Sequence, residues 1–330
     1  MSNRVLTGVK PTSVPHLGNY IGAMRPSIEL SQNAKESFLF IADYHAITSV
    51  QDPKLLEQYT YEVTACWLAC GLDPKKTIIY RQSDVPEIFE LNWIIGCVSP
   101  KGLMNRGHAY KAMLQANEEA GRKDPDDGVS VGLYTYPVLM SADILLFSSD
   151  LVPVGEDQLQ HIEYARDIAE KFNRVYGEVL HLPKPHIQKG TLVPGLDGRK
   201  MSKSYNNHIP LFLDSKKLRK LVMKIKTDST PPEDPKELDS NDLYTLYKHF
   251  ATVDELKALE ARYKEGVGWG EVKQTLFEKI ESHFEEPTKK YNELMSDKSQ
   301  LDQILKEGAL KAREIAAPLM TKVRTAIRGN

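Results

Sequence analysis

The sequence has few cysteines, only Cys66, Cys70 and Cys97 in 330 residues. An odd and sparse set argues against a disulfide framework and for a reducing compartment. Cys66 and Cys70 are four residues apart on a predicted helix and could in principle chelate a metal ion, but no second pair or nearby histidine completes such a site. We therefore interpret both as small apolar core residues and expect no metal site built by the protein itself.

Long hydrophobic runs, internal repeats and an excess of charge are also missing. No apolar stretch approaches the ~20 residues that a membrane-spanning helix needs, and no basic region followed by an apolar run marks a signal peptide. We therefore expect a cytoplasmic protein without membrane attachment. The net charge is -2, so no overall basic field indicates nucleic acid, although local patches bind RNA even on acidic proteins.

The remaining composition is that of an ordinary globular protein, with 41% hydrophobic and 27% charged residues. In the first half, short apolar runs alternate with helical patterns, and one helix is expected from Asp52-Pro53 to Gly71. The candidate strands are residues 4–8, 38–42, 77–80 and 151–154. This alternation predicts an α/β fold, a Rossmann-type parallel sheet with helices on both faces.

The pattern changes after about Pro210, where polar helical segments replace strands and residues 229–241 form a proline-rich loop. Helices are expected at residues 271–284, 287–295, 301–307 and 309–327. We therefore predict an α/β domain over residues 1–209 and a C-terminal all-α domain over residues 210–330. Within the first domain, the polar residues 115–130 predict an exposed insertion or a mobile loop.

A first chemical motif, Pro15-His16-Leu17-Gly18-Asn19-Tyr20, follows the first strand and opens a helix. The free N–H groups and the dipole of a helix N-terminus favour an anion such as a triphosphate. Gly18 has no Cβ, so a flat adenine ring could lie against its backbone, and His16 could donate a hydrogen bond to a phosphate oxygen. Taken alone, this pattern is more often a simple turn.

A second motif, Gly198-Arg199-Lys200-Met201-Ser202-Lys203-Ser204, places two lysines around a small polar residue in a loop. Such a loop can close over a pyrophosphate group, and its ammonium groups can neutralise the charge of a departing anion. Most basic runs are solvated surface loops, but the string Lys-Met-Ser-Lys-Ser makes that reading improbable here.

In this order, the two motifs resemble the paired motifs of the class I aminoacyl-tRNA synthetases. The first looks like the His-Ile-Gly-His element of that class, and the second matches its partner letter for letter. Other segments are similar to the bacterial tryptophanyl branch, so the resemblance covers nearly the whole chain. These segments are residues 7–23, 140–145, 152–169 and 308–313.

Asp143 can also be argued from physical chemistry. It lies on a strongly apolar helix predicted to begin near Pro137, and it shares a face with Met140. A buried carboxylate is costly unless a partner satisfies it. Asp143 is therefore either a structural acid held by backbone N–H groups or a basic partner, or the acceptor for an indole N–H, which has one donor and no acceptor.

The resemblance implies further roles. One set would line a tryptophan pocket: Leu6, Gly8, His45, Met140, Asp143, Val152, Val154 and Gln158. A second set would contact ATP: Lys10, Gly18, Asn19, Gly22, Asp157, Met201 and Ser202. A third would be catalytic and contact phosphates: His16, Lys111, Lys200 and Lys203. Core packing is the alternative for the apolar members, and a structural role is nearly as good an interpretation of His45.

Three residues depart from the family pattern. Ser13 stands where a glycine is expected, so that turn can have another shape. Leu6 replaces a common aromatic residue and could loosen one pocket wall. Lys10 replaces a frequent glutamine and adds a cation near the phosphates.

By resemblance, the reaction joins tryptophan and ATP into tryptophanyl-adenylate, with Mg²⁺ as cofactor and pyrophosphate as product. The tryptophanyl group then passes to the 3′ end of tRNA(Trp). The resemblance also implies a homodimer in which one tRNA spans both subunits. Cations of the last helix are either RNA contacts or a solvated face: Lys311, Arg313, Lys322, Arg324 and Arg328.

Three other functions stay open. A tyrosyl enzyme is disfavoured by Asp143 and by residues 154–158. A small-molecule nucleotidyltransferase of the same superfamily, such as a pantothenate-activating enzyme, would lack a helical domain like residues 210–330. A non-catalytic RNA-binding relative would be expected to lose one of His16, Lys200 and Lys203, which are all present.

Overall fold

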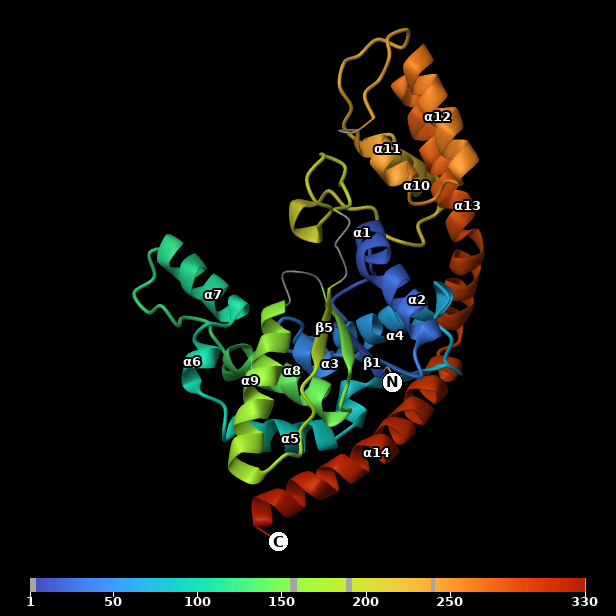
Figure 1. Cartoon of the computed structure of the whole chain (residues 1–330). Helices are drawn as coiled ribbons and strands as arrows, with labels where there is room; N and C mark the ends of the chain where they lie inside the picture. Colours follow the sequence, from blue (N-terminus) through green and yellow to red (C-terminus); the bar gives the residue numbers. More distant parts are fainter. Residues whose placement is uncertain (1–3, 155–158, 188–191, 239–240, 330) are drawn as a thin grey trace.

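The computed structural model describes residues 4–154, 159–187, 192–238 and 241–329. A parallel sheet of five strands lies at its centre, in the order β3-β2-β1-β4-β5 (Figure 1). The strands are β1 (Arg4–Val9), β2 (Glu36–Ile41), β3 (Thr77–Arg81), β4 (Leu151–Val154) and β5 (Lys184–Ile187). The predicted Rossmann-type sheet is confirmed, because the strand order reverses beside β1 as in doubly wound folds.

The four strands predicted from apolar runs all form, and β5 is an addition. Its sequence, Lys-Pro-His-Ile, offers no apolar run to recognise. It is an edge strand of the sheet, the position in which a proline is tolerated.

Both faces of the sheet are covered. In β2, Leu39 and Ile41 belong to one hydrophobic cluster, whereas Phe38 and Phe40 belong to the other, because successive side chains of a strand point to opposite faces. Helices α4 (Pro53–Ala69) and α13 (Trp269–Ser296) pack together on the first face. The second face carries α5 (Glu87–Gly96), α8 (Val131–Leu146) and α9 (Leu159–Tyr176) (Figure 1).

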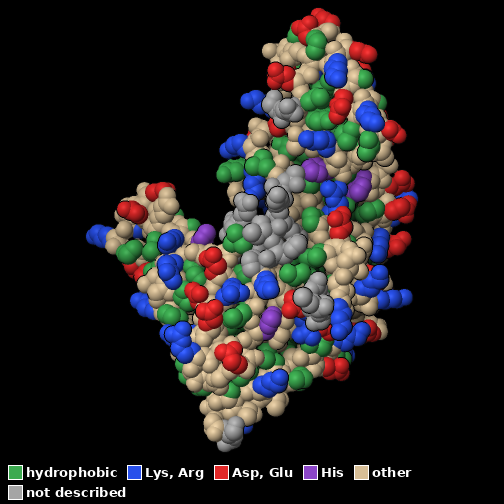
Figure 2. All heavy atoms as spheres, viewed as in Figure 1, with side chains coloured by type: hydrophobic (Ala, Val, Ile, Leu, Met, Phe, Trp, Pro, Cys, Tyr) green, Lys and Arg blue, Asp and Glu red, His purple; other side chains and the backbone are tan. Residues whose placement is uncertain are grey.

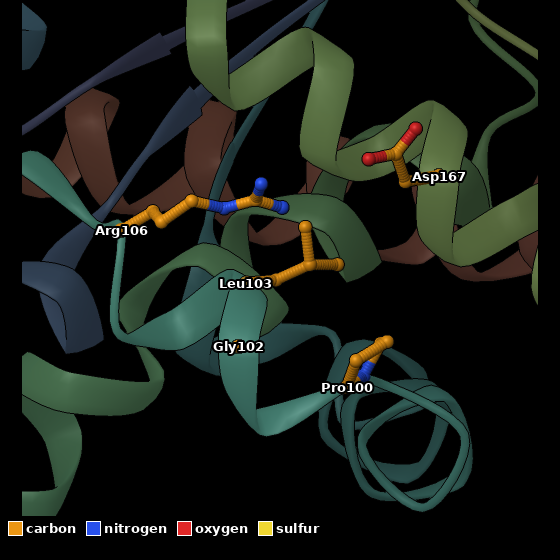
Figure 3. A pocket seen from close by; sticks show the side chains of 5 residues that line it. All are labelled: Pro100, Gly102, Leu103, Arg106 and Asp167. Atoms are coloured by element: carbon orange, nitrogen blue, oxygen red, sulfur yellow. The ribbon is translucent and has the colours of Figure 1, made fainter.

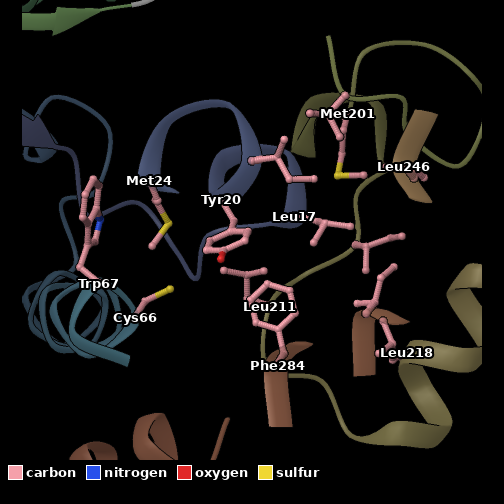
Figure 4. Packing of buried hydrophobic residues seen from close by; sticks show 14 of the residues in the cluster. Leu17, Tyr20, Met24, Cys66, Trp67, Met201, Leu211, Leu218, Leu246 and Phe284 are labelled. Atoms are coloured by element: carbon pink, nitrogen blue, oxygen red, sulfur yellow. The ribbon is translucent and has the colours of Figure 1, made fainter. Parts of the chain in front are cut away.

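The first motif opens a continuous helical segment. It consists of α1 (Leu17–Asn19), a five-residue π-helix η1 (Tyr20–Met24) and α2 (Arg25–Asn33). Its apolar side, Leu17, Tyr20 and Met24, enters the first cluster beside Met201 and Phe284 (Figure 4). The first motif is therefore anchored on a packed helix.

One expectation for the middle of the chain was wrong, and a second holds only in part, since the residues from 115 to 130 are mostly exposed. Helix α8 begins at Val131 and not near Pro137, because the Ser130 hydroxyl accepts the Leu133 N–H at 3.1 Å and caps the helix earlier. The polar stretch 115–130 is not wholly a loop, since α7 (His108–Glu119) includes its first five residues. The turn after α7 is ordered by buried Asn117, whose amide donates to the carbonyls of Pro125 and Asp127, each at 2.8 Å.

The C-terminal part is helical, as predicted. It contains α10 (Ser215–Val222), α11 (Asp242–Tyr247), α12 (Val253–Glu265), α13 and α14 (Ser299–Arg328). The four helices expected after residue 270 are only two, because Pro287 and Gly308 lie inside α13 and α14 and do not end them. Tertiary packing overrides the low helix propensity of both residues.

Helix α14 returns along the sheet-bearing part of the molecule (Figure 1). It packs against β3 and α5, and a Cβ at Gly308 would lie 1.8 Å from the Ile79 carbonyl oxygen. Two ion pairs link it to α5, Arg313 with Glu87 at 3.1 Å and Arg324 with Glu90 at 2.7 Å. Across the described ranges, the model contains no helix with the length and apolar character to cross a bilayer.

We predict that Gly308→Ala lowers the free energy of unfolding by about 1–3 kcal/mol or more, because the new methyl group overlaps the backbone of β3. Gly270→Ala is the matched control, since that helical glycine has open space around it and alanine should be neutral or slightly stabilising. Urea denaturation of both variants checks this. Equal stability of the two would contradict the close packing of α14 on β3.

Candidate active site

Several of the predicted site residues gather beyond the carboxyl ends of β1, β2 and β3, where parallel sheets place ligands. Gly8 and Lys10 lie at the end of β1, and His45 lies in α3 (Asp43–Ala46), just after β2. Asp143 reaches the same region from α8. Residues distant in the sequence are therefore brought together at one sheet edge.

A buried polar network surrounds Asp143, which is 0% exposed. The Nε2 atom of His45 lies 3.0 Å from Asp143 Oδ2, and Nε2 of Gln82 donates to both carboxylate oxygens at 2.9 Å. Burial raises the pKa of the Asp143 carboxyl, and the contacts with His45 and Gln82 partly oppose that rise. The carboxylate is satisfied as a structural acid would be, but not by backbone N–H groups.

Gln82 was missed in the sequence. It is 0% exposed, follows β3 directly, and also accepts the His45 backbone N–H at 3.3 Å. It thus fixes both Asp143 and His45. Its position directly after a recognisable strand was the available signal, because polar residues at that edge of a parallel sheet are candidate ligands.

The surroundings of this network are partly aromatic. The rings of His45 and Tyr136 are 4.2 Å apart, and Lys10 Nζ lies 5.8 Å from the Tyr136 ring while donating to Thr48 Oγ1 at 3.1 Å. Burial lowers the pKa of Lys10. Met140 on α8 is half-buried.

The other residues assigned to the tryptophan pocket differ in placement. Gly8 approaches a neighbouring ring so closely that a Cβ there would lie 2.5 Å from Phe40. Leu6 and Val152 are buried in the second hydrophobic cluster, as core residues would be. Val154 closes β4, but its side chain, together with Asp157 and Gln158, lies outside the described residues.

His16 caps α1. Its Nδ1 accepts the Asn19 N–H at 3.3 Å, and its own N–H donates to Asn19 Oδ1 at 3.1 Å. Burial, followed by the positive charges of Lys203 and His208, lowers the pKa of His16 to about 4. The ring is therefore neutral at pH 7, and because Nδ1 accepts, Nε2 carries the proton and can donate to an anion.

The first motif pairs through its backbone with the segment that follows the second motif, and it also contacts Met201 of that motif. The Leu17 N–H donates to the Ile209 carbonyl at 2.8 Å, and the Leu211 N–H donates to the Pro15 carbonyl at 3.1 Å. The Gly18 N–H points at the sulfur of buried Met201, 3.2 Å away. A Cβ at Gly18 would lie 3.2 Å from the Met201 Cβ, so the two motifs are in close contact.

Asn207 organises the second motif and was also missed. Its Oδ1 accepts the Ser202 N–H at 2.8 Å, and its Nδ2 donates to Asp197 at 2.6 Å and to the Lys200 carbonyl at 3.2 Å. A Cβ at Gly195 would lie 2.4 Å from this side chain. Its place three residues after Ser204 of the basic loop was the available signal, because asparagine side chains often order loops through hydrogen bonds to the backbone.

Lys203 points back at the first motif. Its Nζ donates to the Ser13 hydroxyl, and burial lowers the pKa of this lysine. The departure at Ser13 therefore supplies a hydrogen-bond acceptor that a glycine would lack. Lys200 and Ser202 belong to the same loop, and the Lys200 side chain is exposed.

Three predicted residues stand apart. Lys111 is exposed on α7, which projects away from α1 and the second motif (Figure 1). Gly22 lies in η1 with open space around it, and the Asn19 side chain is already used by the His16 N–H. The structure does not bring these three to the Lys203 contact.

Other hollows lie outside the predicted site. Figure 2 shows the molecule notched between the α7 arm and the lobe of α10 to α12. A hollow of about 380 Å³ lies between α6 (Lys101–Met104) and α9, where Arg106 reaches toward Asp167 (Figure 3). None of its lining residues is a predicted site residue.

The fold is a parallel sheet accompanied by two motifs of the kind that bind phosphate groups, and this combination is typical of a nucleotide-using enzyme. Sequence comparison identifies the class. Residues 1–285 match the family model described as tRNA synthetases class I (W and Y), and the chain belongs to this class. It is 53% identical to a tryptophan–tRNA ligase from Neisseria meningitidis, over 98% of this chain and 97% of that one. Within the class, the chain belongs to the bacterial tryptophan–tRNA ligase family.

Solved structures agree with this assignment. A tryptophanyl-tRNA synthetase from Campylobacter jejuni, complexed with ADP and tryptophan, superposes with a TM-score of 0.89 at 43% identity, covering 98% of this chain and 99% of that one. One from Mycoplasma pneumoniae gives a TM-score of 0.81 at 28% identity over 99% and 98% of the two chains. The predicted fold is thereby confirmed.

We predict that Gln82→Met lowers the free energy of unfolding by about 1–3 kcal/mol, because buried Asp143 loses two hydrogen bonds. Gln303→Met is the control, since exposed Gln303 donates to exposed Glu307 at 2.8 Å. Thermal or urea unfolding measures both. The effect at Gln82 should shrink in an Asp143→Asn background, and an undiminished effect there would refute the coupling.

Proposed function

We propose that this chain is a tryptophan–tRNA ligase and that its site residues select tryptophan and stabilise the charge of the reacting phosphates. The carboxylate of tryptophan attacks the α-phosphorus of ATP, an oxygen–phosphorus bond forms, and the bond to pyrophosphate breaks. The tryptophanyl group then passes to the 3′ end of tRNA(Trp) with release of AMP. Two observations carry the proposal: the contact between the motifs of His16 and Lys203, and the buried Asp143 network that follows the carboxyl ends of β2 and β3.

Asp143 is proposed to select tryptophan. A carboxylate has about four lone-pair sites, and three contacts from His45 and Gln82 use three of them. The remaining site can accept the indole N–H. Phenylalanine would leave that acceptor unpaired, which penalises it strongly.

Other residues support this pocket. The buried Nδ1 of His45 has no partner among the described residues, so it is available to the substrate. Gly8 and Met140 are proposed as walls of the pocket, together with Leu6, Val152, Val154 and Gln158. The close contact of Gly8 with Phe40 leaves no room for a side chain there.

Catalysis is proposed to come from positioning and charge stabilisation, because this reaction needs no protein nucleophile. Neutral His16 donates through Nε2 to a phosphate oxygen, and Lys203 exchanges the Ser13 hydroxyl for the pyrophosphate leaving group. Lys200 adds a second ammonium group, and Lys111 could act only if α7 approached the loop. The remaining proposed ATP contacts are Lys10, Gly18, Asn19, Gly22, Asp157, Met201 and Ser202.

Mg²⁺ is proposed to enter with ATP. Groups of three or more His, Cys, Asp or Glu side chains suited to a metal ion do not occur among the described residues, and the groups around His16 are cationic or neutral. This donor set fits an ion that is held mainly by phosphate oxygens, as Mg²⁺ often is. When bound, such an ion supplies positive charge to the phosphates.

Residues 1–209 are proposed as the catalytic domain and residues 210–330 as the tRNA-recognition domain. The last helix contributes less to RNA binding than its sequence suggests, because Arg313 and Arg324 already pair with Glu87 and Glu90. Lys311, Lys322 and Arg328 are not part of these pairs.

A homodimer is proposed from an exposed apolar patch. Trp93 on α5 is 75% exposed and Val131 on α8 is 78% exposed. Tyr44 and Ile47 are also exposed, and the Tyr44 ring lies 4.8 Å from that of Phe89, one helical turn before Trp93. Large exposed apolar patches mark interaction sites, and a second copy of this chain could bury this one symmetrically.

We predict tryptophan-dependent ATP–pyrophosphate exchange, with no exchange on tyrosine or without an amino acid. Lys203→Ala should lower kcat about 10²–10³-fold, because one stabilising charge is lost. Lys75→Ala, which removes an exposed lysine before β3, is the control and should leave exchange unchanged. Exchange with tyrosine alone would move the chain to the sister family, and no exchange with either amino acid would refute the proposed function.

We also predict that Trp93→Glu converts a dimer into a monomer, because a buried unpaired charge at the centre of an interface is strongly unfavourable. Sedimentation velocity of the wild type and the variant measures this. Val253→Glu, at another exposed apolar residue on α12, is the control and should stay dimeric. A monomeric wild type would refute the dimer.

A further inference from the structure

Helix α10 has an unusually cationic outer face. Its sequence and the residues that follow it bury Leu218, Val222 and Ile225 in the first hydrophobic cluster. The same stretch carries six lysines and arginines with exposed side chains: Lys216, Lys217, Arg219, Lys220, Lys224 and Lys226. We call this set the α10 basic face.

Most of this positive charge is not neutralised within the molecule. Lys217 pairs with Asp214 at 2.9 Å, and Arg219 donates to the neutral amide of Gln274 at 3.0 Å. Lys216, Lys220 and Lys224 form no ion pair with any described residue. Lys216 and Lys220 lie at i, i+4 spacing on α10, where like charges repel each other, and Lys224 follows in the turn after the helix.

The α10 basic face differs in this respect from the cations of α14. There, Arg313 and Arg324 are held by carboxylates of α5 and serve to dock the helix. The face on α10 carries an internal repulsion that no docking contact offsets. A binding partner with dense negative charge would relieve that repulsion, so the arrangement favours a polyanion.

The face also has a shape and a position. Lys216, Arg219, Lys220, Met223 and Lys224 line a shallow hollow of about 430 Å³. The end of this segment is tied to the second motif, because the Lys226 N–H donates to the Leu196 carbonyl at 2.8 Å. The basic face is thus joined through backbone to the loop that carries Lys200 and Lys203.

We propose that the α10 basic face binds the phosphate backbone of the tRNA, with Lys216, Lys220 and Lys224 as the contacting cations. This inference rests on the proposed function and adds where the RNA lies. A polynucleotide held here would run past the second motif, as it must if its 3′ end is to reach the adenylate. Lysine contacts to phosphate give affinity without reading sequence, so the bases are read elsewhere.

The experiment compares two double variants of equal charge. Lys220→Ala/Lys224→Ala removes two cations of the basic face. Lys75→Ala/Lys76→Ala removes two exposed lysines just before β3, outside the basic face. For each protein, the Kd for tRNA(Trp) is measured by filter binding over a salt series. Tryptophan-dependent ATP–pyrophosphate exchange, which needs no tRNA, is measured in parallel.

We expect the α10 variant to bind tRNA about tenfold more weakly, with a salt dependence of log K shallower by about 1 per lysine removed. Exchange should stay at the wild-type level in both variants, and the Lys75/Lys76 control should bind tRNA normally. Equal tRNA binding by both variants would overturn the proposal. Failure of the proposed function would appear separately, as absent exchange in the wild type.

Discussion

The short backbone pairing between residues 15–17 and 209–211 is the constraint on which the site depends. It brings together the first motif and the segment that follows the second motif, which are separated by most of the α/β unit, and it places Gly18 against Met201. Burial and then the charge of Lys203 lower the pKa of His16, and Lys203 lies close enough to act because this pairing brings the second loop to the first helix. Without it, each motif would be the ordinary turn or basic loop that its sequence resembles.

Neighbouring residues also hold the polar groups of the proposed tryptophan pocket in place. Asp143 is tolerated in the apolar interior because Gln82 and His45 donate to it, and these two residues are themselves held at strand ends. A carboxylate with one acceptor site to spare is prepared for a ligand that brings one donor. Selectivity then comes from the cost of leaving that site empty.

The sequence was sufficient for the four apolar strands, the Rossmann-type sheet and both motifs, since each rests on local periodicity or a short string. It was insufficient where a contact between residues distant in the sequence determines a helix boundary or the role of a side chain. Gly308 lies inside α14 because β3 leaves no room for a side chain at that position. Pro137 lies inside α8, and does not begin it, because Ser130 caps the helix earlier. Gln82 and Asn207 carry no motif of their own, and only the folded chain shows what they hold.

The close packing of Gly308 on the Ile79 backbone also affects the exposed edge of the sheet. β3 is an outer strand, and an outer strand presents unpaired N–H and C=O groups that invite pairing with another chain. Helix α14 lies across that border, with Gly308 against the Ile79 backbone. A helix from the far end of the chain thereby shields the sheet from edge-to-edge aggregation, so it protects solubility in addition to contributing to packing.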